Sequence, residues 1–314
     1  MRRRALGRTG LQTTELGLGT WGLSGDAYGA VTEAESARVV ERALQLGISL
    51  FETADSYAHG EVERRLAGLL PAAPAAVVVT KVGTDREAVP PRKRFDAAYV
   101  AAAVERSAER LGRSTLDVVL LHNPSARAIA RGEATRILRD LAATGAIRAW
   151  GVSAGDEETG RAALAEGAPV VEVAYNAFHR RTLRAILPEV KEREVGILAR
   201  SVLAHGLLCG HWAADKRFPE GDHRADRWTP DELRLRIRHL DALRPVVGNA
   251  VLTLRSGALR FVLEEPAVSC AVLGARSVVQ LDQLVREAGR EPPYLGEEKL
   301  AALARRLDDL RVEA

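Results

Sequence analysis

The chain has little cysteine, few aromatic residues and no long hydrophobic run among its 314 residues. Its two cysteines, Cys209 and Cys270, lack metal-ligand spacing, which argues against a disulfide scaffold or zinc module and favours a reducing compartment. No stretch reaches the roughly 18 apolar residues of a membrane span. The first seven residues include three arginines and lack the apolar segment of a signal peptide. We therefore expect a cytoplasmic protein without a membrane partner.

The charges are nearly balanced, with 45 basic and 42 acidic residues and a net charge of +3. A nucleic-acid-binding surface needs basic residues clustered on one face, whereas here they are scattered, so we expect no nucleic-acid partner. Hydrophobic residues make up 46% of the chain, enough for a large core, which excludes a disordered protein. Only five basic residues are lysines, so a lysine in an apolar setting needs a reason.

Eight short apolar runs alternate with helical patterns along the chain. The expected strands are 16–21, 50–54, 76–82, 116–122, 149–153, 170–175, 196–201 and 269–274. Most are apolar throughout, which is typical of parallel strands buried on both faces. The expected helices are 33–47, 61–70, 96–111, 131–143, 156–166, 183–192, 254–264, 277–288 and 297–312, with a further start at Thr229-Pro230.

This alternation predicts an α/β fold, a (β/α)8 TIM barrel formed by one domain over residues 1–314. A doubly wound sheet is the alternative, but it needs fewer strands and a reversal of strand order. The turn-forming segment 6–11 predicts an N-terminal β-hairpin at the bottom of the barrel, and the helices beyond eight are extra.

Four polar side chains stand at the ends of three successive strands, where barrel enzymes place their chemistry. These are Glu52 and Tyr57 after the second strand, Lys81 in the third and His122 in the fourth. Alone, each has a structural explanation, such as a buried ion pair or a core histidine. Together they indicate chemistry, because an ammonium beside a phenol lowers its pKa and makes Tyr57 a general acid. Glu52 would hold Lys81 in place.

A glycine-rich segment, 17–22, has the spacing G-x-G-x-x-G of a dinucleotide fingerprint. That fingerprint must open directly into a helix, whereas the next expected helix begins ten residues later at Thr32. We therefore interpret the segment as a glycine-rich loop above a strand.

Several motifs resemble the aldo-keto reductase family over essentially the whole chain. They are F-E-T-A-D-S-Y (51–57), T-K (80–81), L-L-H (120–122), G-A-I-R (145–148) with G-V-S (151–153), Y-N (175–176), the segment 203–210, and G-A-R-S (274–277) with Gln280. The resemblance implies an NADPH-dependent oxidoreductase that transfers hydride to a small-molecule aldehyde or ketone. By the same resemblance Tyr57 protonates the developing alkoxide, Lys81 lowers the tyrosine pKa, and His122 orients the carbonyl.

The resemblance also implies where a dinucleotide binds. The candidate residues are Gly19, Thr20, Trp21, Ser153, Glu172, Arg200, Ser201, Leu203, Gly206, Gly274, Arg276, Ser277, Gln280 and Gln283. We expect NADPH to be preferred over NADH, because a guanidinium binds phosphate bidentately and a helix start at Ser277 favours an anion. No metal is expected, and the sequence does not set the oligomeric state.

Four positions depart from the family pattern: Glu52 replaces an aspartate, Ala154 an asparagine, Glu172 a glutamine, and Arg200 an aromatic residue. Glu172 would favour a cationic, oxidised nicotinamide, and Arg200 would disfavour it, so we expect the two to pair. Neutral divergence is the other explanation. These departures keep open a regulatory subunit that binds NADPH with little turnover. An isomerase or lyase that uses Glu52 as a base is a third alternative.

Two loops have open interpretations. The segment 212–228, with Trp212, Phe218 and Trp228, is either a lid over a dinucleotide or an ordinary loop packed on the barrel. The basic segment 86–94 either attracts an anionic substrate or is simply solvated. His59 either lines the mouth of the pocket or lies on the surface.

Overall fold

Eight parallel strands close into a barrel in this computed structural model, which describes residues 1–70, 76–244, 247–248, 251, 253–289 and 291–312. Around the barrel the order is β3, β4, β5, β8, β9, β10, β11 and β12, and β12 pairs with β3. Their bounds are β3 (Leu16–Gly19), β4 (Leu50–Glu52), β5 (Val77–Val82), β8 (Leu116–His122), β9 (Ile147–Ala154), β10 (Val170–Ala174), β11 (Gly196–Arg200) and β12 (Val268–Gly274). The predicted (β/α)8 barrel is confirmed.

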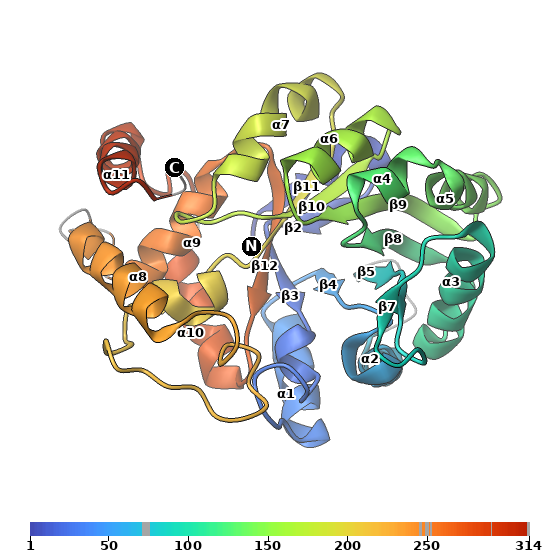
Figure 1. Ribbon diagram of the computed structural model, residues 1–314, viewed down its shortest axis with the longest axis horizontal. Coiled ribbons are helices and arrows are strands. Elements are labelled where there is room, and N and C mark those ends of the chain that lie inside the picture. The colour runs from blue at the N-terminus through green and yellow to red at the C-terminus, as the bar shows by residue number, and fades with distance from the viewer. Residues whose placement is uncertain (71–75, 245–246, 249–250, 252, 290, 313–314) are drawn as a thin grey trace.

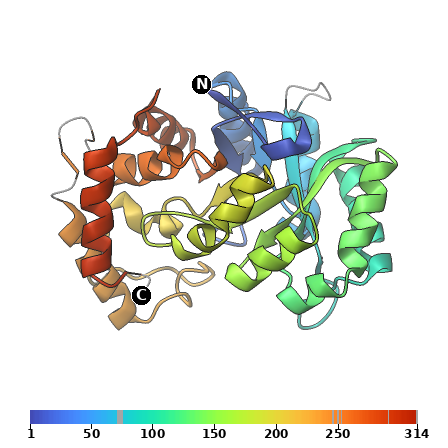
Figure 2. The same ribbon diagram turned by 90° about the horizontal axis from the view of Figure 1, so that it is seen from above.

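Helices surround the strands on the outside of the barrel (Figure 1). They are α1 (Glu33–Gln45), α2 (Glu61–Leu69), α3 (Ala97–Leu111), α4 (Ala126–Ala130), α5 (Glu133–Ala143), α6 (Glu157–Ala165), α7 (Arg181–Glu192), α8 (Pro230–Leu243), α9 (Leu254–Glu264), α10 (Val278–Ala288) and α11 (Glu297–Asp309). The expected reciprocal cap forms between Thr32 and Glu35. Seen from above, the red helix α11 stands at one edge of the molecule, away from the green helices (Figure 2).

Some short elements were not expected from the sequence. Helix α4 has five residues, too few for a periodic pattern, and it starts where the side chain of Ser125 accepts from the amide of Ala128. A small antiparallel hairpin, β6 (Thr84–Asp85) and β7 (Arg92–Lys93), follows the carboxyl end of β5. The 3-10 turns are η1 (Gly7–Thr9), η2 (Trp21–Leu23), η3 (Tyr57–Gly60) and η4 (Ala204–Cys209). Three of these turns, η2, η3 and η4, lie in loops that follow barrel strands.

The hydrophobic core has two layers, one inside the barrel and one between the strands and the helices. The inner layer includes side chains from every barrel strand except β3, such as Leu120 and Leu198. The predicted N-terminal hairpin, β1 (Arg3–Ala5) with β2 (Gln12–Thr14), adds Leu6 and Leu11 to this layer and so closes the bottom of the barrel. Within the described residues, no helix is long and apolar enough to span a membrane.

Candidate active site

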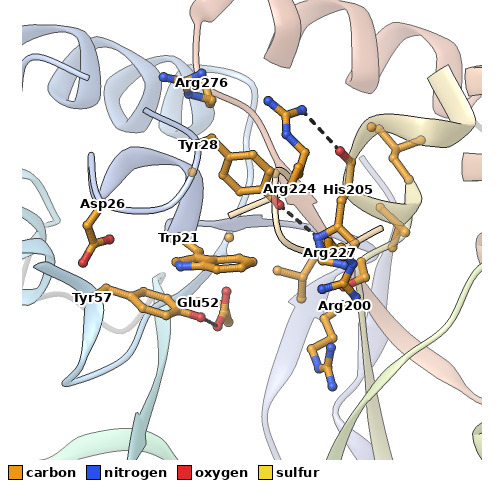
Figure 3. A pocket seen from close by; sticks show the side chains of 18 of the residues that line it. Trp21, Asp26, Tyr28, Glu52, Tyr57, Arg200, His205, Arg224, Arg227 and Arg276 are labelled. Carbon is orange, nitrogen blue, oxygen red and sulfur yellow. Dashed lines mark hydrogen bonds between the residues drawn. The ribbon is translucent and has the colours of Figure 1, made fainter. Parts of the chain in front are cut away.

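A cavity of about 820 Å³ opens at the carboxyl ends of the barrel strands. Residues at or next to the ends of seven strands line it: Gly19, Glu52, Lys81, His122, Ser153, Arg200 and Gly274. The loops that follow the strands form the rest of its wall, so side chains far apart in sequence meet here. Figure 3 shows Trp21 lying over Tyr57, with Glu52 beside the tyrosine hydroxyl.

Glu52, Lys81 and Tyr57 form one buried cluster. The ammonium of Lys81 contacts Oε1 of Glu52 and also donates to the carbonyl oxygen of Thr53 at 2.9 Å. The hydroxyl of Tyr57 donates to the same Glu52 oxygen at 3.3 Å, and Lys81 Nζ lies 5.0 Å from the centre of the tyrosine ring. Lys81 is only 2% exposed. Glu52, although longer than the family's aspartate, therefore reaches Lys81 and also contacts Tyr57.

Burial dominates the proton affinities in this cluster. It raises the pKa of the Tyr57 hydroxyl, and the negative charge of Glu172 raises it further. Our expectation of a lowered Tyr57 pKa is therefore wrong for this structure. Burial also lowers the pKa of Lys81 to about 8, although Glu172 opposes this effect. Tyr57 is thus a neutral phenol near neutral pH.

His122 faces the same end of the cavity. Its ring centre lies 6.1 Å from that of Tyr57, and its Nδ1 is 3.4 Å from the hydroxyl of Ser56. Burial holds the pKa of His122 well below its usual value, and the charge of Lys81 adds to the effect. The imidazole is therefore neutral, and a neutral imidazole can donate one hydrogen bond to a ligand oxygen. Lys93 donates to the backbone oxygen of His122 at 2.8 Å.

Ser153, Glu172 and Arg200 form a second polar group beside Lys81. The hydroxyl of Ser153 donates to Oε2 of Glu172 at 2.6 Å, and Nε of Arg200 lies 4.0 Å from the same oxygen. The other oxygen, Oε1, is 4.0 Å from Lys81 Nζ and, among the described residues, has no hydrogen-bond partner. Arg200 also donates to the oxygen of Ala154 at 3.3 Å. Glu172 and Arg200 thus form a long ion pair, with Glu172 fully buried behind the cavity wall.

The wall continues through η4 and the start of α10. Ser201, Leu203, Gly206, Gly274, Arg276, Gln280 and Gln283 all line it, as does Trp21. Arg276 donates to the backbone oxygens of Gly29 and Ala30 at 3.1 and 3.0 Å, and Gln280 accepts from its amide. Three expected residues, Thr20, Glu172 and Ser277, do not line the cavity, and Glu172 is buried behind its wall. The hydroxyl of Thr20 is buried and donates to the oxygen of Glu52, and Ser277 caps α10 by accepting from Gln280.

The segment 212–228 reaches across to the loop between β3 and α1. Tyr28 forms an isolated bridge with Asp222, and the amide of His223 donates to the oxygen of Ala27. Arg224 and Arg227 from this segment line the cavity, together with Tyr28 and His205, whose side chains are 3.2 Å apart. Sequence reasoning missed these residues, because their role depends on two loops meeting in space.

The basic side chains of segment 86–94 lie in two different environments. Arg86 and Lys93 line the cavity, whereas Arg94 pairs with Asp85 and Asp96 outside it. Arg86 lies 3.7 Å from Asp26 of the β3–α1 loop, and it also contacts His59 at 3.0 Å. His59 itself is exposed and does not line the cavity, so the surface interpretation fits it. Among the described residues, no group of His, Cys, Asp and Glu has the arrangement needed to hold a metal ion.

The cavity has the volume and the donor groups of a small-molecule site. Its volume lies within the roughly 300–1,000 Å³ of small-molecule sites. The arginines that line it include Arg200, Arg224, Arg227, Arg255 and Arg276, of which two form close ion pairs with acidic residues, Arg224 with Asp222 and Arg255 with Glu287. In the described part of the chain, buried polar atoms without a partner include Nε of Arg200 and Nε of Arg276. A dinucleotide phosphate and a carboxamide would supply the missing partners.

Comparisons with known proteins agree with this geometry. The sequence model described as the aldo/keto reductase family matches residues 15–291. The chain is 29% identical over 304 residues to an aldo-keto reductase, YhdN, of Bacillus subtilis (strain 168), covering 92% of this chain and 89% of that one. It is 28% identical over 323 residues to pyridoxal 4-dehydrogenase of Microbacterium luteolum, covering 90% and 92% of the two chains.

Among solved structures, the glycerol dehydrogenase AKR11B4 from Gluconobacter oxydans is similar, with a TM-score of 0.84 and 26% identity over 99% of this chain and 96% of that one. The family match covers most of the chain and includes every barrel strand. The chain therefore belongs to the aldo/keto reductase family, whose members are oxidoreductases acting on carbonyl and alcohol substrates.

Proposed function

We propose that this protein reduces an aldehyde or ketone to an alcohol with NADPH as the hydride donor. The observation that carries the proposal is the meeting of Tyr57, Lys81 and His122 at one end of a cavity whose wall extends to Arg276. Fold alone does not supply function, so the proposal rests on these side chains. Two similar proteins, pyridoxal 4-dehydrogenase and glycerol dehydrogenase, are named for small substrates with a carbonyl or hydroxyl group, which supports a substrate of this class.

Tyr57 is the proton donor in this proposal. NADPH supplies a hydride to the carbonyl carbon when bound, and the oxygen that gains negative charge takes the proton of the Tyr57 hydroxyl. Burial keeps that hydroxyl protonated, and the nearby ammonium of Lys81 stabilises the phenolate left behind. The neutral imidazole of His122 donates a hydrogen bond that fixes the carbonyl oxygen near Tyr57.

The preference for NADPH over NADH rests on Arg276. Its side chain lines the cavity and donates only through NH2 to backbone oxygens, leaving the buried Nε without a partner. Guanidinium groups bind phosphate oxygens through paired N–H donors, so the 2′-phosphate is a suitable partner. Arg276→Met should weaken NADPH binding about tenfold and leave NADH binding nearly unchanged. Equal losses for both dinucleotides would contradict the preference.

Tyr57→Phe tests the reaction itself. The variant keeps the ring and removes only the hydroxyl, so we expect loss of carbonyl reduction by about a hundredfold or more with unchanged NADPH affinity. Turnover across a panel of aldehydes and ketones, measured by NADPH absorbance, gives the result. Full turnover by the variant would refute the role of Tyr57.

A binding subunit with little turnover is the second candidate. The Glu52 contact with both Lys81 and Tyr57 favours it, because the proton donor is already hydrogen-bonded to a carboxylate. Tight NADPH binding without turnover of any carbonyl in the panel would support this function. The isomerase or lyase alternative is weaker, because Glu52 is committed to Lys81 and Tyr57 instead of being free as a base.

A further inference from the structure

We propose that Glu172 and Arg200 act as an opposed charge pair that sets the relative affinity of the site for oxidised and reduced dinucleotide. This inference rests on the proposed function, because it assumes that a nicotinamide dinucleotide binds in the cavity. It assigns to both residues a role in discriminating the two redox states of the cofactor, beyond simply contacting it.

The first observation is that the charges near the reacting end occur in two pairs. Lys81 on β5 contacts Glu52 on β4, and Arg200 on β11 lies 4.0 Å from Glu172 on β10. Tyr57, His122 and Ser153 also face this cluster, and all three are neutral near pH 7. Two further cations act here, because, in addition to burial, the charge of Lys93 lowers the Lys81 pKa and the charge of Arg200 lowers the Arg227 pKa. Glu172 Oε1 also lies 4.0 Å from Lys81 Nζ, so removal of either member of the Glu172–Arg200 pair changes the net charge of the whole cluster by one.

The second observation is that the Glu172–Arg200 pair is loose and incompletely satisfied. Glu172 Oε1 and Arg200 Nε are both buried, and neither atom has a hydrogen-bond partner within the described residues. The shortest approach of the two side chains is 4.0 Å, longer than a hydrogen bond. Each charge is thus only partly neutralised by the other. Arg200 lines the cavity, whereas Glu172 lies behind its wall, so Glu172 acts on a ligand through its electric field and not by direct contact.

A nicotinamide ring that reacts beside Tyr57 would lie near this pair. Hydride transfer requires the donor carbon close to a carbonyl carbon whose oxygen lies near Tyr57. The arginine-rich wall and Arg276 lie toward β11 and β12, the neighbours of β10 in the barrel. A dinucleotide whose phosphates follow that wall must bring its ring to Tyr57 past Arg200, on β11.

The oxidised ring carries one positive charge that the reduced ring lacks. Fixed charges in a water-poor site act strongly at such distances, and only a differential interaction changes the relative affinities of two forms. Glu172 attracts the oxidised ring and Arg200 repels it. The two charges therefore act in opposite directions on the ratio of the two affinities.

Three variants test the proposal by equilibrium titration with NADP⁺ and NADPH, followed by tryptophan fluorescence. Glu172→Gln should raise the ratio of the NADP⁺ Kd to the NADPH Kd about tenfold, because Arg200 is left uncompensated. Arg200→Gln should lower the same ratio by a similar factor. The double variant should return close to the wild-type ratio, even where its absolute affinities fall.

Glu63→Gln is the matched control. Glu63 is also a buried glutamate paired with an arginine, Arg110, but neither residue lines the cavity. This variant tests whether the loss of any buried ion pair changes the ratio of the NADP⁺ Kd to the NADPH Kd by disturbing the fold. We expect that ratio to stay unchanged. Circular dichroism and melting temperature show whether each variant is folded.

The outcomes are distinguishable. The proposal is supported if the ratio of the two Kd values shifts in opposite directions in the two single variants and returns to the wild-type value in the double variant. Shifts in the same direction, or unchanged ratios with dinucleotide binding intact, overturn the proposal and leave the proposed function standing. Absence of dinucleotide binding by the wild-type protein overturns both.

Discussion

Glu172 has an effect on proton affinity that is separate from its effect on the cofactor. Burial lowers the pKa of Lys81 to about 8, and the negative charge of Glu172 opposes this lowering. Lys81 loses its proton as the pH rises through this value, and the phenolate of Tyr57 then loses its nearby cation. We expect kcat/KM for reduction to fall above about pH 8.

Glu172→Gln should move this alkaline limb to lower pH, because a neutral amide no longer raises the Lys81 pKa. The measurement is the pH profile of kcat/KM for the carbonyl substrate at saturating dinucleotide, for wild type and variant. A limb that stays in place or moves to higher pH in the variant would show that Glu172 does not act on Lys81.

The buried carboxyl group of Asp55 makes the free energy of unfolding depend on pH. Burial raises its pKa to about 7, and the neighbouring charge of Glu63 adds to the shift. The folded state therefore binds the proton more tightly than the unfolded state, so stability decreases as the pH rises from about 4 to about 7. Asp55→Asn keeps an acceptor and removes the charge, and it should raise the free energy of unfolding by about 1 kcal/mol at pH 8.

The same Asp55→Asn variant should show almost no gain at pH 4, where the wild-type carboxyl is protonated. Urea denaturation at both pH values gives the comparison. An equal gain at both pH values would mean that the charge of Asp55 is not the cause.

Individual side chains were predictable where they stand on predicted strands. Glu52, Lys81 and His122 were expected to meet because their strands end at one rim of the barrel, and they do. The direction of the Tyr57 pKa was not predictable, because burial of the hydroxyl is a property of the assembled site. Tyr28, Arg224 and Arg227 were missed for a similar reason, since nothing in their local sequence indicates that two loops meet.

At the scale of elements, the N-terminal hairpin has a structural task away from the site. Leu6 is fully buried and packs with the inner layer of the barrel at the end opposite the cavity. Leu6→Ala should lower the free energy of unfolding by about 2–5 kcal/mol and leave dinucleotide affinity unchanged. Denaturant titration and a binding titration on the same variant check both parts. A large loss of affinity would mean that the hairpin supports the site.

Elements with a clear hydrophobic pattern were predicted from the sequence, whereas very short elements without such a pattern were not. All eight barrel strands begin and end within two residues of their expected bounds, because parallel strands buried on both faces are apolar throughout. Helix α4 and the β6–β7 hairpin are too short for any periodicity. Helix α4 depends on the cap at Ser125, and the hairpin depends on the pairing of two residues in each strand. Both form only in the context of the folded protein.

At the scale of the whole molecule, the single closed barrel predicts that the protein unfolds in one cooperative transition. The loop containing Asp222 is joined to the β3–α1 loop, and β12 closes on β3, so early and late parts of the chain support each other. Far-ultraviolet circular dichroism and tryptophan fluorescence should give coincident urea transitions. Two separate transitions would contradict the single-domain prediction.

The most direct test of the proposed activity is a titration of the purified protein with NADPH and with NADH, followed by tryptophan fluorescence. Trp21 and Trp212 line the cavity, so a bound dinucleotide should quench them. We expect saturable quenching by both dinucleotides, with the tighter Kd for NADPH. Tighter binding of NADH would contradict the role of Arg276, and binding of neither would contradict the proposed reductase function.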